Sequence, residues 1–131
     1  RPVFERKYVT WIEQPLDVDA MRRAAKLLCG THDYRAFCSL KKFKKSTVRT
    51  VEEMNIEHLG KEIRISYTGD GFLYHMVRIL TGTLVEVGEG ARKPEDMPTI
   101  LMSMDRANAG KLMPPEGLTL ECVEYEDNLK K

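Results

Sequence analysis

The sequence has 131 residues, which is enough for one domain built around a single hydrophobic core. Hydrophobic residues make up 42% and charged residues 31%, which is typical of a globular protein, and the chain has no internal repeat or low-complexity tract. With 21 basic and 20 acidic side chains the net charge is +1, so the overall charge indicates no class of partner.

The cysteine and hydropathy patterns indicate in which cellular compartment the protein is expected. The three cysteines include no Cys-x-x-Cys spacing, which argues against a disulfide framework and a zinc site. No run approaches the roughly 18 apolar residues of a membrane span, and no signal-peptide pattern is present. We therefore expect a cytoplasmic protein with no membrane partner. Because the chain begins at Arg1 rather than at a methionine, we expect a processed product or a piece of a longer protein.

The first third of the chain predicts a strand, a helix and a loop. Residues 4–12 are rich in aromatic and β-branched types, which favours a strand. Asp17 is a good N-cap for a helix over about 18–28, where apolar residues recur at helical spacing, and Gly30 ends it. Residues 30–46 show no sustained periodicity and are expected to be mostly loop.

The central part predicts a hairpin and two helices. Alternating apolar residues indicate strands over 48–56 and 63–67, joined as an antiparallel hairpin around residues 58–61. A long apolar helix is predicted over 72–87, and Pro94 suits the first turn of a shorter helix that runs to about 104.

The last part predicts a connection over 105–113 and a strand over 118–125. The element order is then strand, helix, strand, strand, helix, helix, strand, which matches the split β-α-β pattern of ferredoxin-like and RNA-recognition folds. We predict one α+β domain over residues 1–131, with helices packed on one face of an antiparallel sheet.

A narrow polar stripe runs along the predicted helix 72–87. It contains Gly71, His75, Arg78 and Gly82, whose offsets of about three or four align on one side of a helix. One interpretation is that the stripe simply faces solvent. A mid-helix glycine costs up to about 1 kcal/mol relative to alanine, so Gly82 instead suggests that something approaches this face closely. If Arg78 is partly buried, it needs a carboxylate or phosphate partner.

A basic run lies in the predicted loop. It consists of Lys41, Lys42, Phe43, Lys44 and Lys45, preceded by Tyr34, Arg35 and Phe37. Such a run is commonly a solvated loop, but cations mixed with aromatic rings also suit phosphate contacts and base stacking. Nucleic acid is the ligand that this mixture favours.

The remaining signals are weaker. His32 and Asp33 form an adjacent pair that suits a turn hydrogen bond better than a catalytic couple. Cys38 has no evident base partner. Residues 114–118 read as a stiff turn whose leucine enters the core. No phosphate-binding loop, nucleophile elbow, metal triad or dinucleotide motif occurs.

Taken together, the motifs resemble the TruA-type tRNA pseudouridine synthases. The matching segments are Gly-Thr-His-Asp-Tyr at 30–34 with Phe37, Phe-Leu-Tyr-His-Met-Val-Arg at 72–78 with Gly82, Val-Glu-Val-Gly at 85–88, and Pro-Glu-Gly-Leu at 115–118. The resemblance covers essentially the whole chain and only the C-terminal half of the family's protein.

The resemblance implies an isomerase that converts uridine to pseudouridine in the tRNA anticodon stem-loop without cofactor or metal. The uridine is flipped out of the helix, detached at nitrogen, rotated and rejoined at carbon. The family's catalytic aspartate lies in an Arg-x-Asp-x-Gly-Val-His-Ala type motif of the N-terminal half, and its active-site tyrosine lies upstream as well. This sequence contains no such motif, so we expect the chain alone to be inactive.

The resemblance also implies roles for individual residues. Arg78 matches the arginine that pairs with the catalytic aspartate, so we expect it to lack that partner here. Phe72, His75 and Leu118 would line the active site. The basic run, together with Arg35, would contact the tRNA backbone rather than read its sequence. The expected partners are tRNA, the N-terminal half of the same protein and a second copy in a homodimer.

Two other functions remain open on the residues alone. The chain could be a standalone RNA-binding α+β module without catalysis, for which the basic run would suffice. A pure dimerisation domain is the third alternative, and it leaves Arg78 and its stripe unexplained.

Overall fold

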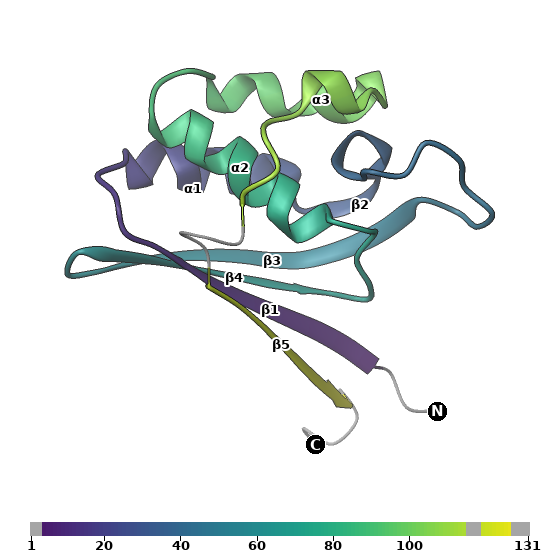
Figure 1. Ribbon diagram of the computed structural model, residues 1–131, viewed down its shortest axis with the longest axis horizontal. Coiled ribbons are helices and arrows are strands. Elements are labelled where there is room, and N and C mark those ends of the chain that lie inside the picture. The colour runs from purple at the N-terminus through teal and green to yellow at the C-terminus, as the bar shows by residue number, and fades with distance from the viewer. Residues whose placement is uncertain (1–3, 115–118, 127–131) are drawn as a thin grey trace.

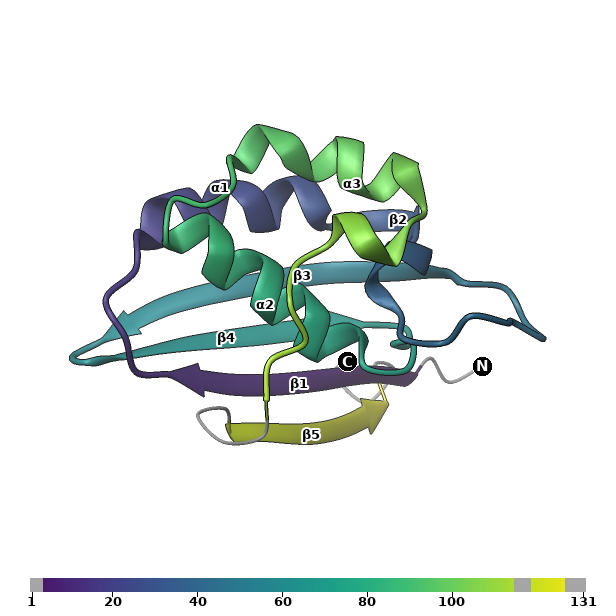
Figure 2. The same ribbon diagram turned by 45° about the horizontal axis from the view of Figure 1, so that its top comes forward.

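An antiparallel sheet covered by helices on one face forms the molecule (Figure 1). The computed structural model describes residues 4–114 and 119–126, with side chains over 5–114. Within these ranges the sheet has five strands in the order β2-β3-β4-β1-β5, and each neighbouring pair is antiparallel. Figure 2 shows the helices together above the sheet, so the predicted α+β fold is confirmed.

The elements alternate along the chain much as predicted. The strands are β1 (Phe4–Ile12), β2 (Gly30–Asp33), β3 (Val48–Leu59), β4 (Glu62–Gly69) and β5 (Thr119–Glu126). The α-helices are α1 (Val18–Leu28), α2 (Met76–Gly88) and α3 (Met97–Ser103), and the short 3-10 helices are η1 (Arg35–Phe37), η2 (Pro94–Asp96) and η3 (Arg106–Asn108). Asp17 caps α1 as predicted, since its carboxylate accepts a hydrogen bond of 3.1 Å from the Ala20 amide.

The predicted hairpin is confirmed, and its imperfect alternation has a structural cause. β3 and β4 pair from Leu59 and Glu62 onward, across a turn in which Gly60 has a φ of +63°. The register then shifts between Val51 and Glu53, so that one extra residue bulges from β3 and breaks the two-residue period.

The prediction that residues 30–46 are mostly loop is wrong at its start. Gly30–Asp33 forms β2, which pairs with β3 from Gly30 opposite Val51 to Asp33 opposite Val48, and η1 follows it. This strand is four residues long and polar, so it has no hydrophobic alternation, and it exists because β3 offers it an edge to pair with.

The long helix begins later than predicted, at Met76 rather than at residue 72. His75 has a φ of +64°, which lies in the left-handed region, so an α-helix cannot continue through it. Phe72 precedes the helix, but its apolar side chain continues the periodic pattern of the sequence. The ring packs edge-on against Tyr8, with ring centroids 5.1 Å apart. The helix ends at Gly88, within one residue of the predicted end.

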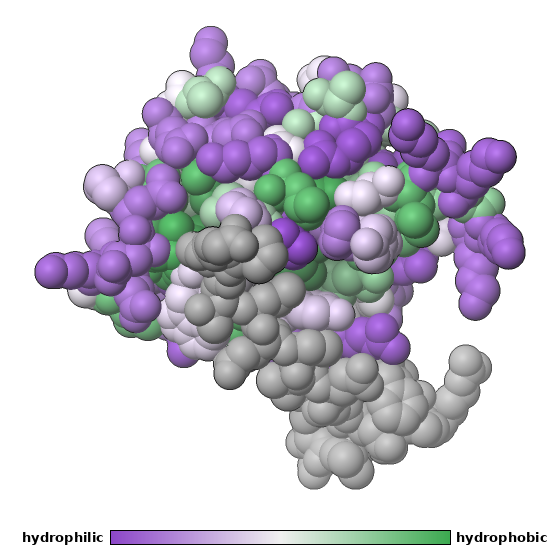
Figure 3. All heavy atoms as spheres, viewed as in Figure 1, coloured by the Kyte–Doolittle hydropathy of each residue, from purple (hydrophilic) through white to green (hydrophobic). Residues whose placement is uncertain are grey.

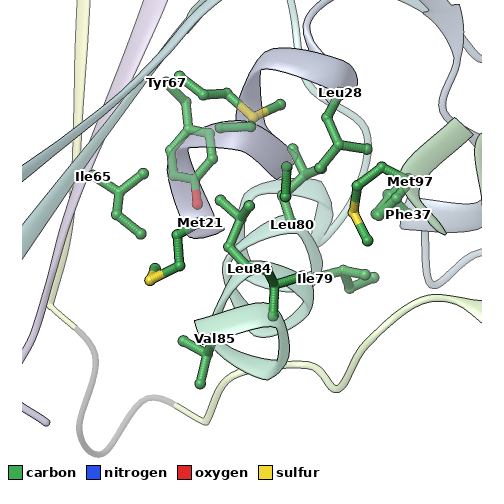
Figure 4. Close-up of a cluster of buried hydrophobic side chains, with 14 of the residues drawn as sticks. Met21, Leu28, Phe37, Ile65, Tyr67, Ile79, Leu80, Leu84, Val85 and Met97 are labelled. Atoms are coloured by element: carbon green, nitrogen blue, oxygen red, sulfur yellow. The ribbon is translucent and has the colours of Figure 1, made fainter. Parts of the chain in front are cut away.

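The hydrophobic core lies between the sheet and the helices. Figure 4 shows side chains of α1, β4, α2 and η1 converging there, among them Leu28, Ile65, Leu84 and Phe37. Tyr67 is fully buried, and its hydroxyl forms a 2.6 Å hydrogen bond with Thr81 Oγ1 on α2, so the polar tip is satisfied. No helix in the described ranges combines the length and hydrophobicity that crossing a membrane requires.

Candidate functional site

Arg78 projects from the first turn of α2 and is half-buried. Its guanidinium donates hydrogen bonds to the Met113 carbonyl oxygen, from Nε at 2.7 Å and also from Nη2. In return, the Met113 amide donates to the Arg78 carbonyl oxygen at 3.4 Å. No carboxylate contacts this guanidinium within residues 5–114, so a backbone carbonyl holds its position there.

Gly82 lies one turn further along α2 and allows residues 110–113 to lie against the helix. A Cβ placed on Gly82 would come within 1.8 Å of the Lys111 carbonyl oxygen. Gly110 contributes from the other side, since its own Cβ would meet Thr83 Cα at 2.6 Å, and its amide donates to Thr83 Oγ1 at 2.9 Å. The close approach predicted from Gly82 is confirmed, and the approaching group is a segment of the same chain.

The predicted polar stripe is wrong in its N-terminal half. Gly71 and His75 precede α2, so only Arg78 and Gly82 share the helix. His75 instead ends the turn before the helix, with its ring stacked on Tyr74 at 3.8 Å between centroids and with a 3.0 Å hydrogen bond between Nδ1 and Ser39 Oγ.

The ionisation of His75 responds to Arg78. Desolvation and, as a smaller effect, the positive charge of Arg78 lower the pKa of the His75 imidazole from its ordinary value near 6.5. The neutral imidazole is therefore favoured beside the Arg78 guanidinium. A neutral imidazole can form hydrogen bonds without adding a second positive charge to the site.

A small pocket brings together three of the predicted site residues. It has a volume of about 180 Å³. Its lining consists of Tyr8, Phe72, Leu73, His75, Met76, Val77 and Arg78. Arg78, His75 and Phe72 thus lie around one cavity, which we call the arginine pocket. Leu118, also predicted to line the site, lies outside the described residues.

A larger pocket lies beside the basic run, with a volume of about 440 Å³. Its lining consists of Leu40, Lys42, Phe43, Lys44, Lys45, Ser46, Thr47, Arg49, Phe72, Leu73 and Tyr74. Phe72 and Leu73 also line the arginine pocket, so the two cavities share these two residues as part of their walls. We call this cavity the lysine pocket.

The lysines of the run are exposed, and within residues 5–114 none of them takes part in an ion pair. Figure 3 shows hydrophilic side chains projecting at the right-hand end, where Figure 1 places the loop between β2 and β3. Lys41 does not line the pocket, and Arg35 reaches it only indirectly, since its guanidinium lies 4.8 Å from the Phe43 ring centroid.

The lining of the lysine pocket includes Arg49 and Tyr74, which were not predicted as site residues. Arg49 follows the lysine run by four positions and donates from Nη1 to the carbonyl oxygens of Ser46 and Val48, at 2.8 Å each. Tyr74 is 54% exposed and lies within the recognised 72–78 motif. Extending the basic run to the next cation, and reading the aromatic residues of that motif as surface residues, would have included both.

Asp33 has the structural role that the sequence favoured. Its carboxylate accepts hydrogen bonds from the Arg35 amide at 3.1 Å and from the Thr47 hydroxyl at 2.6 Å. It therefore ties both ends of the loop that carries the lysines. His32 is occupied as well, by a 2.8 Å hydrogen bond between Nε2 and the Cys29 carbonyl oxygen.

The sequence is similar to known proteins of one family. The model of the tRNA pseudouridine synthase family matches residues 24–126. The chain is 48% identical over 123 residues to tRNA pseudouridine synthase A of Brevibacillus brevis, covering 94% of this chain and 50% of that protein. It is 44% identical to the enzyme of the same name in Geobacillus kaustophilus, covering 97% of this chain and 49% of the relative.

A third relative extends the pattern, since tRNA pseudouridine synthase A 2 of Clostridium perfringens is 44% identical over 95% of this chain and 51% of its own length. The chain thus spans about half the length of the curated relatives that it matches. With a family match over most of its residues and high identity to these relatives, the chain belongs to the tRNA pseudouridine synthase family, whose members are isomerases.

Proposed function

We propose that this chain is the C-terminal half of a tRNA pseudouridine synthase that isomerises uridine in the tRNA anticodon stem-loop. The catalytic aspartate is supplied by the N-terminal half, which lies outside the chain, and no cofactor is used. The observation that carries this proposal is the combination of a family match over residues 24–126 with coverage of only half of each relative.

The geometry of Arg78 supports the assignment. A guanidinium has five N–H donors, and the Met113 carbonyl engages only the edge formed by Nε and Nη2. Within residues 5–114 no partner engages Nη1, so the end formed by Nη1 and Nη2 is available. A carboxylate can bind this end through two parallel hydrogen bonds, which keeps the carboxylate ionised and fixes its orientation.

The surroundings suit a reaction on an extruded base. The arginine pocket combines the aromatic rings of Tyr8 and Phe72 with the Arg78 guanidinium, and enzymes that act on bases stack the extruded base among apolar groups. The lysine pocket shares Phe72 and Leu73 with the arginine pocket, so that backbone phosphates of the same RNA have cations nearby.

The decisive experiment is a pseudouridine assay on the protein made from the full reading frame. Release of tritium from tRNA labelled at uridine C5 reports the reaction, because that hydrogen is lost when the ring rejoins through carbon. We expect release with the full protein, none with the 131-residue chain alone, and recovery when the upstream half is added. Release from the chain alone would contradict the division of the site between two halves.

The proposal extends to cellular setting and assembly. We propose that the full protein acts in the cytoplasm, where its tRNA substrate is found, and that it works as a homodimer, as the resemblance implies. Sedimentation of the full protein across a range of concentrations tests the second point, since a mass equal to one chain at all concentrations contradicts it.

A further inference from the structure

The lysine pocket has features that a solvated charged loop does not need. It is a cavity of about 440 Å³, within the range of 300–1,000 Å³ that is usual for small-ligand sites. Three aromatic residues, Phe43, Phe72 and Tyr74, line it together with Lys42, Lys44 and Lys45 of the basic run. Aromatic rings beside cations offer both a stacking surface and phosphate contacts.

Two of these rings are in contact with a neighbouring side chain. The Arg35 guanidinium lies 4.8 Å from the centroid of Phe43, which is a cation–π contact, and the His75 imidazole stacks on Tyr74 at 3.8 Å with an interplanar angle of 25°. These neighbours restrict the rotation of each ring. The pocket therefore presents aromatic surface at little cost in side-chain entropy.

The loop that carries the lysines is attached at both ends. At its start, the Ser39 amide donates to the Tyr74 carbonyl oxygen at 3.4 Å, and the Ser39 hydroxyl is hydrogen bonded to His75. At its end, the Thr47 hydroxyl donates to Asp33 at 2.6 Å. The loop is thereby held beside residues 72–74, with which it lines the pocket.

Four cations surround the rings, namely Lys42, Lys44, Lys45 and Arg49. Within residues 5–114 none of the three lysines has a carboxylate partner, so each can bind an anion without first breaking an ion pair. An acidic peptide would satisfy these cations but would leave the aromatic surface unused. A nucleotide uses both, because its phosphate meets the lysines and its base stacks on a ring.

We propose that the lysine pocket binds an unpaired RNA nucleotide that neighbours the one presented to Arg78. The base lies on the aromatic surface of Phe43 and Tyr74, and the flanking phosphates contact Lys42, Lys44 and Lys45. The choice of RNA rests on the proposed function. Because Phe72 and Leu73 line both pockets, the two cavities are close enough for one RNA strand to place neighbouring nucleotides in them.

The test is fluorescence anisotropy with the 131-residue chain and a labelled single-stranded hexauridylate. A base stacked on one aromatic residue is worth about a 5- to 150-fold change in affinity, so Phe43→Leu should weaken binding within that range. Phe43→Tyr keeps the ring and should bind within about twofold of the wild type. Replacing Lys42, Lys44 and Lys45 by alanine should reduce the salt slope by roughly 0.7 for each lost phosphate contact.

Lys61→Ala is the matched control, because Lys61 is exposed at the tip of the β3–β4 hairpin, at the opposite end of the sheet (Figure 1). It should leave both affinity and salt slope unchanged. Equal binding by wild type and Phe43→Leu would overturn the proposal, since the lysines would then attract the backbone without a base site. Failure of the wild type to bind the hexamer would overturn it as well.

The outcome is separate from that of the pseudouridine assay. Tritium release by the full protein together with a Phe43→Leu chain that binds the hexamer normally would retain the proposed function and reject the nucleotide pocket. No tritium release together with Phe43-dependent binding would reject the catalytic proposal and retain a site for unpaired RNA.

Discussion

Arg78 and Met113 are joined by hydrogen bonds in both directions, from the Arg78 side chain and from the Met113 backbone amide. The Arg78 guanidinium donates to the Met113 carbonyl, and the Met113 amide donates to the Arg78 carbonyl, across 35 residues of sequence. The direction of the Arg78 side chain therefore depends on residues 110–113 remaining against α2. Gly82 and Gly110 make that contact sterically feasible.

Gly82→Ala should lower the free energy of unfolding by about 2 kcal/mol or more. Alanine gains about 1 kcal/mol in helix propensity, but its Cβ would lie 1.8 Å from a backbone carbonyl, and overpacking against backbone costs more than that gain. Urea unfolding followed by circular dichroism measures the change. Gly71→Ala is the control, because its Cβ would come no closer than 3.4 Å to Arg49 and the stability should change by less than about 1 kcal/mol.

Arg78→Lys in the full protein should reduce the single-turnover rate roughly 100-fold or more while tRNA affinity stays within about threefold. A lysine ammonium cannot donate to the Met113 carbonyl and also hold a carboxylate in a bidentate pair. Rapid-quench tritium release and filter binding measure the two quantities. Arg23→Lys, on the exposed side of α1, is the matched control. A near wild-type rate in Arg78→Lys would remove Arg78 from the active site.

Thr81→Val should destabilise the protein more than Tyr67→Phe. The Thr81 hydroxyl donates to the Val77 carbonyl at 2.7 Å, which leaves its oxygen to accept from the Tyr67 hydroxyl at 2.6 Å. Removing the Tyr67 hydroxyl costs about one hydrogen bond, roughly 1 kcal/mol, whereas valine strands a buried hydroxyl donor at a cost of about 1–3 kcal/mol. Thermal unfolding of the two variants under identical conditions ranks them, and equal losses would contradict this order of donors.

The pKa of His75 should lie below its usual value and should rise part of the way back in Arg78→Gln. The rise is partial because desolvation, the larger cause, remains when the charge of Arg78 is removed. The imidazole resonances followed by NMR between pH 4 and 9 report both values. A His75 pKa that does not respond to Arg78→Gln would contradict the electrostatic contact.

The same shift fixes the sign of a pH effect on stability. Because the folded-state pKa of His75 is lowered, the unfolded chain binds the proton more tightly. The contribution of neutral His75 to stability is therefore present above the unfolded pKa near 6.5 and is lost as the pH falls through the folded value. His75→Asn, which tolerates a positive φ, should be less sensitive to acid over that window in denaturant titrations.

Sequence reasoning succeeded where the structure depends on local signals. β1 follows from its aromatic and β-branched residues, the start of α1 from Asp17 and helical spacing, and the β3–β4 hairpin from alternation. All of these signals act over a few residues. The same holds for the end of α2 at Gly88.

Prediction from the sequence failed where the conformation depends on a segment that is distant in the chain. β2 exists through pairing with β3, and the turn at His75 interrupts a continuous apolar pattern at a residue whose left-handed backbone no periodicity reveals. The site shows the same division. Gly82 correctly indicated a close neighbour, yet nothing in the sequence near Arg78 pointed to the Met113 carbonyl.

Phe72 and Leu73 line both the arginine pocket and the lysine pocket, so a ligand that moves either side chain in one pocket also changes the wall of the other. Substitutions at these two positions consequently cannot tune one cavity alone. A substitution at residue 72 or 73 that changes the ligand affinity of one pocket is therefore expected to change the affinity of the other pocket as well.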